Sequence, residues 1–292
     1  MSLVDELAAR CRFPDRSTLD CAVSGGADSL ALLVLACHSG RRANAVHVDH
    51  GLRPGSAADA EVVSDAARRF GAGFASHRVR VDPGPNLEAR ARASRYAVLP
   101  AGVLTGHTAD DQVETILLNL MRGAGLEGLS GIRRERRPLL DLRRSETVAL
   151  CEQLGLQPVV DPTNEDLRLR RNRVRAHLVP LLDEIAERDV VPIVARQADH
   201  LRDVAEWLAS QADTVDVCEV SALVAAPPPV ARVALRRFIQ ERTGADHPPD
   251  TDTVARSLDV VHGRIRSTEL GRGWTLRRRQ GLLRVESGSG AG

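Results

Sequence analysis

The chain has 292 residues, of which 43% are apolar and 27% are charged, a composition typical of a globular protein with one large domain or two ordinary ones. Forty basic residues nearly balance thirty-nine acidic ones, so net charge neither favours nor excludes a nucleic-acid partner. All forty basic residues are arginine. Because Walker A nucleoside triphosphatases, protein kinases and pyridoxal phosphate enzymes each need a lysine in their sites, the sequence excludes these three classes.

The sequence has no run of about 18 apolar residues, and its start lacks the basic and apolar pattern of a secretory signal. We therefore expect a cytoplasmic protein without a membrane partner. The five cysteines, at positions 11, 21, 37, 151 and 218, are widely spaced and form no C-x-x-C pair. This spacing disfavours a disulfide framework, a zinc site and an iron–sulfur cluster, and we expect reduced thiols.

The first two-thirds of the chain alternates strand-like and helix-like segments. Short apolar runs predict strands at Leu19–Val23, Ala43–Val48, Phe74–Val81 and Val103–Gly106. Apolar residues at helical spacing predict helices at Ser29–His38, Ser56–Phe70, Leu87–Val98 and Asp110–Met121. Strands interleaved with helices indicate an α/β fold, a doubly wound parallel sheet whose ligands bind at the carboxyl ends of the strands.

The pattern becomes mostly helical from Leu142 to about Ala212, and the composition then shifts. Pro227–Pro229 cannot continue a helix, Val230–Thr243 has helical spacing, and Trp274–Val285 predicts two short strands around Gln280-Gly281. We expect residues 1–212 to form the main domain with a helical extension. Residues 213–286 should form a second, smaller α+β domain, followed by a flexible tail at 287–292.

The most informative string, Ala22-Val23-Ser24-Gly25-Gly26-Ala27-Asp28-Ser29, joins the first predicted strand to the first predicted helix. Two glycines allow a tight turn, and the N–H groups at a helix N-terminus attract phosphate. Asp28 would repel a bare phosphate, so it suits either Mg²⁺ or a helix N-terminus that a negative charge stabilises. On the residues alone, an ordinary capped strand–turn–helix explains the string equally well.

The whole string, Ser-Gly-Gly-x-Asp-Ser after a first strand, resembles the pyrophosphate loop of the N-type ATP pyrophosphatase superfamily. These enzymes cleave ATP between its α- and β-phosphates and form an adenylated intermediate. The resemblance implies an adenine nucleotide alpha hydrolase-like fold. It also implies that ATP and Mg²⁺ bind at Ser24, Gly25, Gly26, Ala27, Asp28 and Ser29, with Asp28 as the metal ligand.

Further strings narrow the resemblance to the tRNA(Ile)-lysidine synthetase family over roughly residues 19 to 180, with Asp110–Gly123 the most specific segment. In chain order the strings are Val46–Arg53, Asn86–Arg90, Thr105–Gly123, Arg137–Leu140, Asp161–Asn164 and Arg171–Arg175. The C-terminal part resembles the first C-terminal substrate-binding domain of the family only loosely. A further C-terminal domain of longer members has no counterpart in these 292 residues.

The resemblance implies a ligase that acts on tRNA(Ile) with a CAU anticodon. ATP adenylates the wobble cytidine on its C2 oxygen, and the ε-amine of free L-lysine then displaces AMP to give lysidine. The implied partners are therefore the tRNA and lysine. Members are often dimeric, and the sequence leaves a homodimer open.

Asp111 and Glu114 are three residues apart, on one face of the predicted helix Asp110–Met121. Two carboxylates there suit an ammonium group and accept its proton, because an amine must be neutral to attack. The alternative is that they are N-terminal helix charges, with Thr108 as the cap. Since no basic residue is near in the sequence, we favour catalysis, a role that the family motif also implies. Asp28 is the third catalytic candidate, since its loss should abolish adenylation.

His47 and His107 are candidate nucleotide contacts. In a strand, His47 and Asp49 share a face and His50 points away, so a metal cluster is disfavoured and a position beside the adenine of ATP is preferred. His107 precedes the acidic helix, where it either orients a phosphate or nucleobase or is a capping or core histidine. The sequence does not decide between these roles.

Arginines are the candidates for contacts to tRNA or phosphate. Arg90 and Arg95 belong to one family string, and the residues do not decide which of them faces ATP or RNA. No acidic residue interrupts the basic run between Asp166 and Asp183, and there we favour Arg171 and Arg173. A second basic patch consists of Arg133, Arg134, Arg136 and Arg137.

Aromatic residues make up only 2% of the chain, so rings on which RNA bases stack are scarce. Recognition should therefore rely on arginines, shape and one pocket for an extruded cytosine. Three rival functions remain: a tRNA thiolase, a small-molecule amide synthetase with the same ATP loop, and a non-catalytic nucleotide- or RNA-binding module. The cysteine spacing argues against the thiolase.

Overall fold

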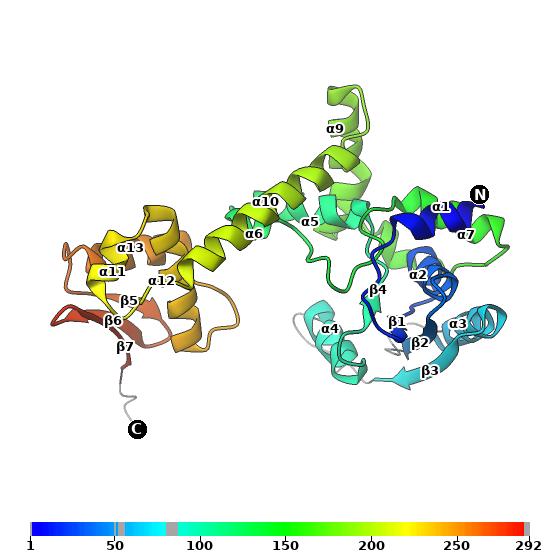
Figure 1. The fold of residues 1–292 in the computed structure, drawn as a ribbon. Helices are drawn as coiled ribbons and strands as arrows, with labels where there is room; N and C mark the ends of the chain where they lie inside the picture. Colours follow the sequence, from blue (N-terminus) through cyan, green and yellow to red (C-terminus); the bar gives the residue numbers. More distant parts are fainter. Residues whose placement is uncertain (1, 50, 52–55, 80–86, 289–292) are drawn as a thin grey trace. The chain divides into compact units, whose positions relative to one another are not determined.

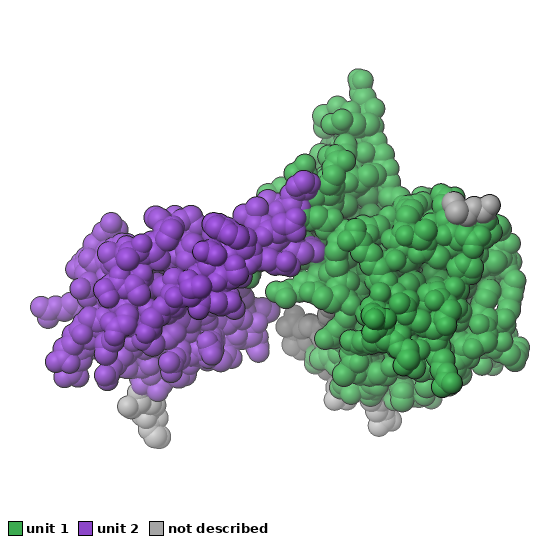
Figure 2. All heavy atoms as spheres, in the orientation of Figure 1, with its two compact units in different colours: residues 1–199 green, residues 200–292 purple. Residues whose placement is uncertain are grey.

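The computed structural model describes residues 2–49, 51, 56–79 and 87–288. The chain divides into two compact units, residues 1–199 and 200–292 (Figure 2). The division falls within helix α10 (Val191–Ala212), which begins in unit 1 and ends in unit 2. The boundary expected after Ala212 lies at the C-terminal end of this helix and stays a prediction. Residues 289–292 of the expected tail lie outside the described residues.

Unit 1 is built on a parallel sheet in the order β3-β2-β1-β4. In that order the strands are Gly73–Arg78, Arg42–Asp49, Thr18–Ala22 and Leu104–Thr105. The chain runs outward from β1 to β3 and then returns past β1 to β4. Right-handed crossovers therefore place α2 (Ala27–His38) and α3 (Ser56–Phe70) on one face and α4 (Leu87–Val98) on the other (Figure 1). The predicted doubly wound parallel sheet is confirmed.

Helix α2 is the centre of the unit 1 core. All its residues from Leu30 to Ala36 are buried, because the sheet covers one side and α1 (Leu3–Arg10) and α7 (Arg144–Gln153) cover the other. A helix that is apolar all round belongs inside a protein. Its first turn is therefore held firmly at the end of β1.

The part of unit 1 that follows β4 is mostly helical, and the mostly helical pattern predicted from Leu142 to about Ala212 is observed within it and in α10. Its remaining elements are α5 (Ala109–Met121), α6 (Leu126–Leu129), the 3₁₀ turn η1 (Pro162–Glu165), α8 (Arg170–Arg173), the π-helical turn η2 (Val174–Leu178) and α9 (Val179–Ala186). The last three follow one another without a break and pack partly on α5. Across the described parts of the chain, we find no helix with the length and apolar character needed to cross a bilayer.

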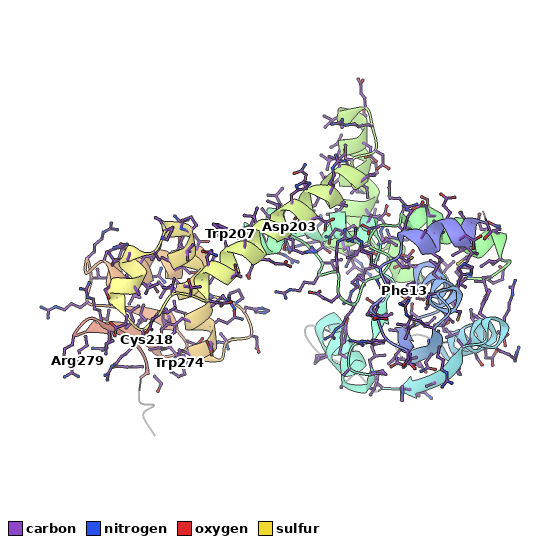
Figure 3. All side chains as sticks on the ribbon, viewed as in Figure 1. Phe13, Asp203, Trp207, Cys218, Trp274 and Arg279 are labelled. Carbon is purple, nitrogen blue, oxygen red and sulfur yellow. The ribbon has the colours of Figure 1, made fainter. Side chains whose placement is uncertain are left out.

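Unit 2 is the expected small α+β unit. Its helices α11 (Val220–Ala225), α12 (Pro228–Thr243) and α13 (Thr251–Val261) accompany an antiparallel sheet of β5 (Ser267–Gly271), β6 (Trp274–Arg279) and β7 (Leu282–Ser287). Gln280 and Gly281 have positive φ and form the predicted turn between β6 and β7. The sequence analysis missed β5. Strand β6 buries Leu276 and exposes Arg277 and Arg279, the latter marked in Figure 3.

Candidate active site

The chain turns sharply after β1 at residues 24–29, which we call the glycine bend. Gly25 has a φ of +94°, and a Cβ there would lie 2.9 Å from Val159 Cγ2, so both conformation and packing require glycine. Gly26 has an ordinary φ of −73° as the N-cap of α2, and an added Cβ would meet nothing closer than 3.8 Å. The protein itself therefore explains Gly25 but not Gly26, whose missing side chain leaves space at the N-terminus of α2.

Ser29 ties the glycine bend together. Its Oγ accepts from Ser24 N at 3.2 Å and donates to the carbonyl of Gly26 at 2.8 Å. Gly106, just after β4, lets the chain after β4 pass close to the backbone of Asp28. A Cβ at Gly106 would lie only 2.5 Å from the carbonyl oxygen of Asp28. Strands β1 and β4 are neighbours whose crossovers lead in opposite directions. The bend therefore lies at the switch point of the sheet, where doubly wound folds bind ligands.

Helix α5 begins with Thr108 as its N-cap, the cap that the alternative explanation of the acidic pair named. Asp111 Oδ2 accepts from Thr108 N at 2.9 Å and from Thr108 Oγ1 at 3.2 Å, which completes a capping box. Asp111 and Glu114 are both buried, although charged side chains are normally exposed. Asp111 therefore caps the helix with one oxygen and keeps the other, Oδ1, for a different partner.

Three carboxylates and three guanidinium groups meet beside the bend and form what we call the acid–arginine cluster: Asp28, Asp111, Glu114, Arg144, Arg171 and Arg175. Arg144 is at its centre. Its Nε donates to Asp28 Oδ2 at 3.2 Å, its Nη1 to Glu114 Oε1 at 3.0 Å and its Nη2 to Asp111 Oδ1 at 2.9 Å. One guanidinium group thus joins the glycine bend to the acidic face of α5.

Glu114 is the most enclosed member of the cluster, with a side chain only 1% exposed. Its Oε2 accepts from Arg171 Nε at 2.6 Å, and its Oε1 accepts from Arg175 Nε at 2.7 Å. Burial raises the pKa of Glu114, but Arg175, Arg144 and Arg171 together outweigh burial and lower the pKa to about 2. Glu114 is therefore ionised at neutral pH and is a poor proton acceptor in this arrangement.

The pKa of Asp28 shifts in the opposite direction. Burial raises the pKa of Asp28 above its usual value, and the nearby charge of Asp111 adds to this effect. The hydroxyl of Thr147 and the guanidinium group of Arg144 both donate to the carboxylate, but they do not outweigh burial. A further cation near Asp28 would therefore be stabilising.

The sequence analysis favoured catalysis partly because Asp111 and Glu114 had no basic neighbours in the sequence, and in space this premise is wrong. Arg144, Arg171 and Arg175 come from 30, 57 and 61 residues beyond Glu114. The two explanations considered for these carboxylates also do not exclude each other, because Asp111 caps α5 and binds arginines. A catalytic role for Asp28, Asp111 and Glu114 stays a prediction.

The two candidate histidines differ in their hydrogen bonds. His47 is 3% exposed at the end of β2, and its Nδ1 lies 2.8 Å from the carbonyl of Val23. Its buried Nε2 has no hydrogen-bond partner among the residues that the structure describes. His107 is partly buried, and its Nδ1 lies 2.7 Å from Thr105 Oγ1. His50 lies outside the described residues. Among the residues that the structure describes, no three side chains of His, Cys, Asp or Glu are grouped so that they could hold a metal ion.

The candidate arginines occupy distinct environments. Arg90, on α4, has two buried donors, Nε and Nη2, without a hydrogen-bond partner in the described segments, whereas the side chain of Arg95 lies outside the description. Arg171 belongs to the acid–arginine cluster, and Arg173 is exposed. Arg134, from the second basic patch, binds Asp141 and Asp199 instead of facing solvent.

The sequence analysis missed Arg144 and Thr147 and did not choose Arg175. None lies in the glycine string or near the acidic pair, so no local spacing could connect them. One signal was available. Arg144 is the first residue of α7, an end of the helix where a positive charge is unfavourable unless something else compensates it. Three carboxylates supply that compensation.

A glycine bend at the switch point of a doubly wound sheet defines a class of nucleotide-binding α/β proteins. The PP-loop domain family matches residues 3–182, and the chain belongs to this family. Similar curated proteins are tRNA(Ile)-lysidine synthases. That of Nocardia farcinica is 39% identical over 82% of this chain and 80% of its own, and that of Mycobacterium leprae is 43% identical over 82% and 79%. At this identity and coverage, the chain belongs to the tRNA(Ile)-lysidine synthase family.

A solved structure agrees with this fold. The U34-tRNA thiolase NcsA from Methanococcus maripaludis superposes with a TM-score of 0.52 over 68% of this chain and 78% of its own. The sequence identity is 15%, so this likeness concerns the fold alone.

Proposed function

We propose that this protein ligates free L-lysine to C2 of the wobble cytidine in the CAU anticodon of tRNA(Ile), with conversion of ATP to AMP and pyrophosphate. One observation carries the proposal: Arg144 contacts both Asp28, beside the glycine bend, and the pair Asp111 and Glu114. A candidate triphosphate site and a candidate amine site thus lie within reach of one guanidinium group. The reaction requires this proximity, because adenylation and amine attack occur at adjacent atoms of one base.

In the first proposed step, the C2 oxygen of cytidine attacks the α-phosphorus of ATP, and pyrophosphate leaves. The N–H groups at the start of α2, the hydroxyls of Ser24 and Ser29 and the space left by Gly26 suit the leaving phosphates. Ala27 adds a backbone N–H. His47 Nε2, buried and lacking a described partner, suits the adenine ring, and His107 flanks the acidic helix nearby in the chain.

Asp28 fits the magnesium ion that would accompany ATP. Each of its oxygens accepts one hydrogen bond in the described structure and keeps a further lone pair, and its raised pKa means that a nearby cation would stabilise the charged form. When bound, Mg²⁺ would neutralise charge on the phosphates. Arg144 would remain as the link between Asp28 and α5.

In the second proposed step, the ammonium group of lysine loses a proton, and the neutral ε-amine then attacks C2 with release of AMP. The amine arrives as an ammonium group, so it must take the place of an arginine at Asp111 and Glu114. We propose that Arg171 and Arg175 exchange Glu114 for phosphate groups of the bound substrates. With fewer arginines beside Glu114, burial, which is the largest single effect on its pKa, is less well compensated. The pKa of Glu114 then rises, and Glu114 becomes able to accept the proton.

The remaining arginines are proposed contacts to tRNA or phosphate. Arg90 and Arg95 would act from α4 and Arg173 from α8, while residues 213–286, with Arg277 and Arg279 exposed on β6, would bind tRNA or substrate. We place the reaction in the cytoplasm because its proposed substrates are tRNA and free lysine. A homodimer stays a prediction.

The test is a transfer assay with ATP, radiolabelled lysine and a tRNA(Ile) transcript that carries CAU. We expect label in the RNA, with one AMP and one pyrophosphate released for each lysine incorporated. A transcript with UAU in place of CAU is the matched control and should remain unlabelled. Label in neither RNA, with or without AMP release, would overturn the proposal in favour of another PP-loop reaction or a binding module.

The thiols argue against the thiolase alternative. All five cysteines are free, and burial raises the pKa of Cys11 and Cys21 to about 12 and that of Cys151 to about 11. Sulfur transfer needs a thiolate, and at these raised pKa values the three thiols remain protonated at neutral pH. The family assignment also favours ligation.

A further inference from the structure

A cavity of about 540 Å³ lies in unit 1, beside the C-terminal half of α5. Its opposite wall is the unbroken helical stretch formed by α8, η2 and α9. Five of its lining side chains are apolar and are here called the apolar floor: Leu118, Met121, Val174, Leu178 and Leu181. The other four are cationic or titratable: Arg122, Arg170, Arg173 and His177.

The cavity is open to solvent despite its apolar floor. Met121 is 61% exposed and Leu181 is 48% exposed, and Arg170 and Arg173 are exposed as well. A lining that combines apolar side chains with arginines is complementary to a flat apolar group that carries negative charge. A nucleotide of single-stranded RNA has this combination, since its base stacks on apolar side chains and guanidinium planes and its phosphate binds arginine.

The basic segment around the cavity uses its two faces for different partners. Arg171 and Arg175 turn toward Glu114, whereas Arg170 and Arg173 line the cavity. Among the described residues that line the cavity, none belongs to the glycine bend or to the acid–arginine cluster. A base in the cavity would therefore be lined by neither the glycine bend nor the acid–arginine cluster, so we take it to be a different base from the one that reacts.

We propose that this cavity holds an unpaired nucleotide that neighbours the reacting cytidine, with its base on the apolar floor and its phosphate at Arg170 and Arg173. The proposal rests on the proposed function, because it takes the RNA as substrate. Glu114 and Met121 are seven residues apart on α5, or about 10 Å along the helix axis. The same helix thus carries the proposed amine site and the floor of the neighbouring base site.

The π-helical turn Val174–Leu178 supports a binding role for this segment. π-helical turns interrupt α-helices at a cost in stability and often occur at functional sites. Here the turn supplies Val174, His177 and Leu178 to the cavity and Arg175 to Glu114. RNA bound at the cavity would therefore contact the segment that supplies arginines to the acidic pair.

The test uses the full chain and a fluorescent RNA hairpin. The hairpin consists of an anticodon stem and its single-stranded loop, which carries the CAU anticodon. Leu181→Glu places a negative charge in the cavity without removing a buried side chain. Its matched control is Ile185→Glu, in the same helix, 72% exposed and outside the lining. We expect Leu181→Glu to weaken hairpin binding about tenfold and Ile185→Glu to leave it within about twofold. Equal affinities of the two variants would overturn the proposal.

A crosslinking experiment locates the base. Hairpins with 4-thiouridine at single loop positions are irradiated with the wild-type protein, and the crosslinked peptide is sequenced. We expect 4-thiouridine next to the wobble cytidine, the first base of the anticodon, to crosslink to the segment around Met121 or to residues 177–181. Crosslinks that fall only elsewhere contradict the proposal.

Failure of the proposed function and failure of this inference can be told apart. If wild-type protein transfers lysine but hairpin binding ignores Leu181→Glu, only the cavity proposal fails. If binding and crosslinks behave as expected but no lysine is transferred, the cavity is an RNA site and the proposed function fails. If Leu181→Glu instead lowers the mass of the protein in sedimentation and leaves RNA affinity unchanged, the face binds a second copy of the chain, and the nucleotide proposal is overturned.

Discussion

Two regions of unit 1 carry carboxylates that bind the same guanidinium group, one partly buried and one buried, and yet their pKa values shift in opposite directions. At the first turn of α2, burial raises the pKa of Asp28 even though Thr147 and Arg144 donate to it. In the second turn of α5, three arginines lower the pKa of Glu114 to about 2 against the effect of burial. The number of cationic donors, and not burial alone, decides which carboxylate is held firmly as an anion.

This difference indicates different roles in the proposed reaction. Asp28 gains from an additional cation, which suits the entry of a magnesium nucleotide at the glycine bend. Glu114 already has its full set of cations, so an ammonium group can bind only if an arginine leaves. Binding of phosphate groups and binding of the amine are therefore coupled through Arg171 and Arg175.

The largest expected effect comes from Glu114→Gln, which removes the charge that three arginines share. Lysine transfer should fall by at least about 100-fold, and the free energy of unfolding should fall by about 3 kcal/mol, because three partly exposed guanidinium groups lose a fully buried counter-charge. Single-turnover transfer and urea denaturation measure the two effects. Glu152→Gln, an exposed site on α7, is the control. Lysine transfer by Glu114→Gln at the wild-type rate would remove Glu114 from the catalytic site.

Low pH should reveal the contribution of Glu114 to the stability of the wild-type protein. The pKa of Glu114 is about 2 in the folded state, below the ordinary value of 4.5, so its contribution to stability is full above about pH 5 and is lost as the pH falls through 4 to 2. The contribution is about 3 kcal/mol. Urea denaturation at pH 6 and pH 3 should show a smaller change in Glu114→Gln than in wild type. Parallel losses in the two proteins would contradict the low pKa.

Arg144→Met breaks the link between the two regions. The free energy of unfolding should fall by about 2 kcal/mol, less than for a fully buried pair, because the Arg144 side chain is 25% exposed. ATP-dependent pyrophosphate release should fall by about tenfold or more, since Asp28 loses its tie to α5. Arg168→Met, whose side chain is 90% exposed, should leave both quantities unchanged. Normal pyrophosphate release by Arg144→Met would show that the link is dispensable.

Substitutions in the glycine bend separate folding from function, and Gly26→Ala has the smallest expected effect on stability. Gly25→Ala should cost about 1–3 kcal/mol, because it strains a positive φ and meets Val159. Gly26→Ala should change stability by less than about 1 kcal/mol, since neither its φ nor its surroundings oppose a methyl group. It should nevertheless reduce pyrophosphate release, because the methyl group would occupy the proposed phosphate space. Unaltered release would place the phosphates elsewhere.

The parts of the fold that sequence could predict depend on local patterns. Apolar runs and helical spacing located β1 to β4 and α2 to α5, and the string at residues 22–29 located the glycine bend. Strand β5 was missed because its sequence, Ser267–Gly271, has one buried residue and no apolar run. Arg144 and Thr147 were missed because their contacts with Asp28 join residues 116 and 119 positions apart, which only the folded sheet brings together.

The most direct test of the account is a crystal structure of the protein with a non-hydrolysable ATP analogue and Mg²⁺. We predict that the β-phosphate accepts hydrogen bonds of about 3 Å from backbone N–H groups of residues 26–29, with Arg144 still bridging Asp28 and the acidic face of α5. An empty glycine bend, or a triphosphate bound far from Asp111 and Glu114, would contradict the account.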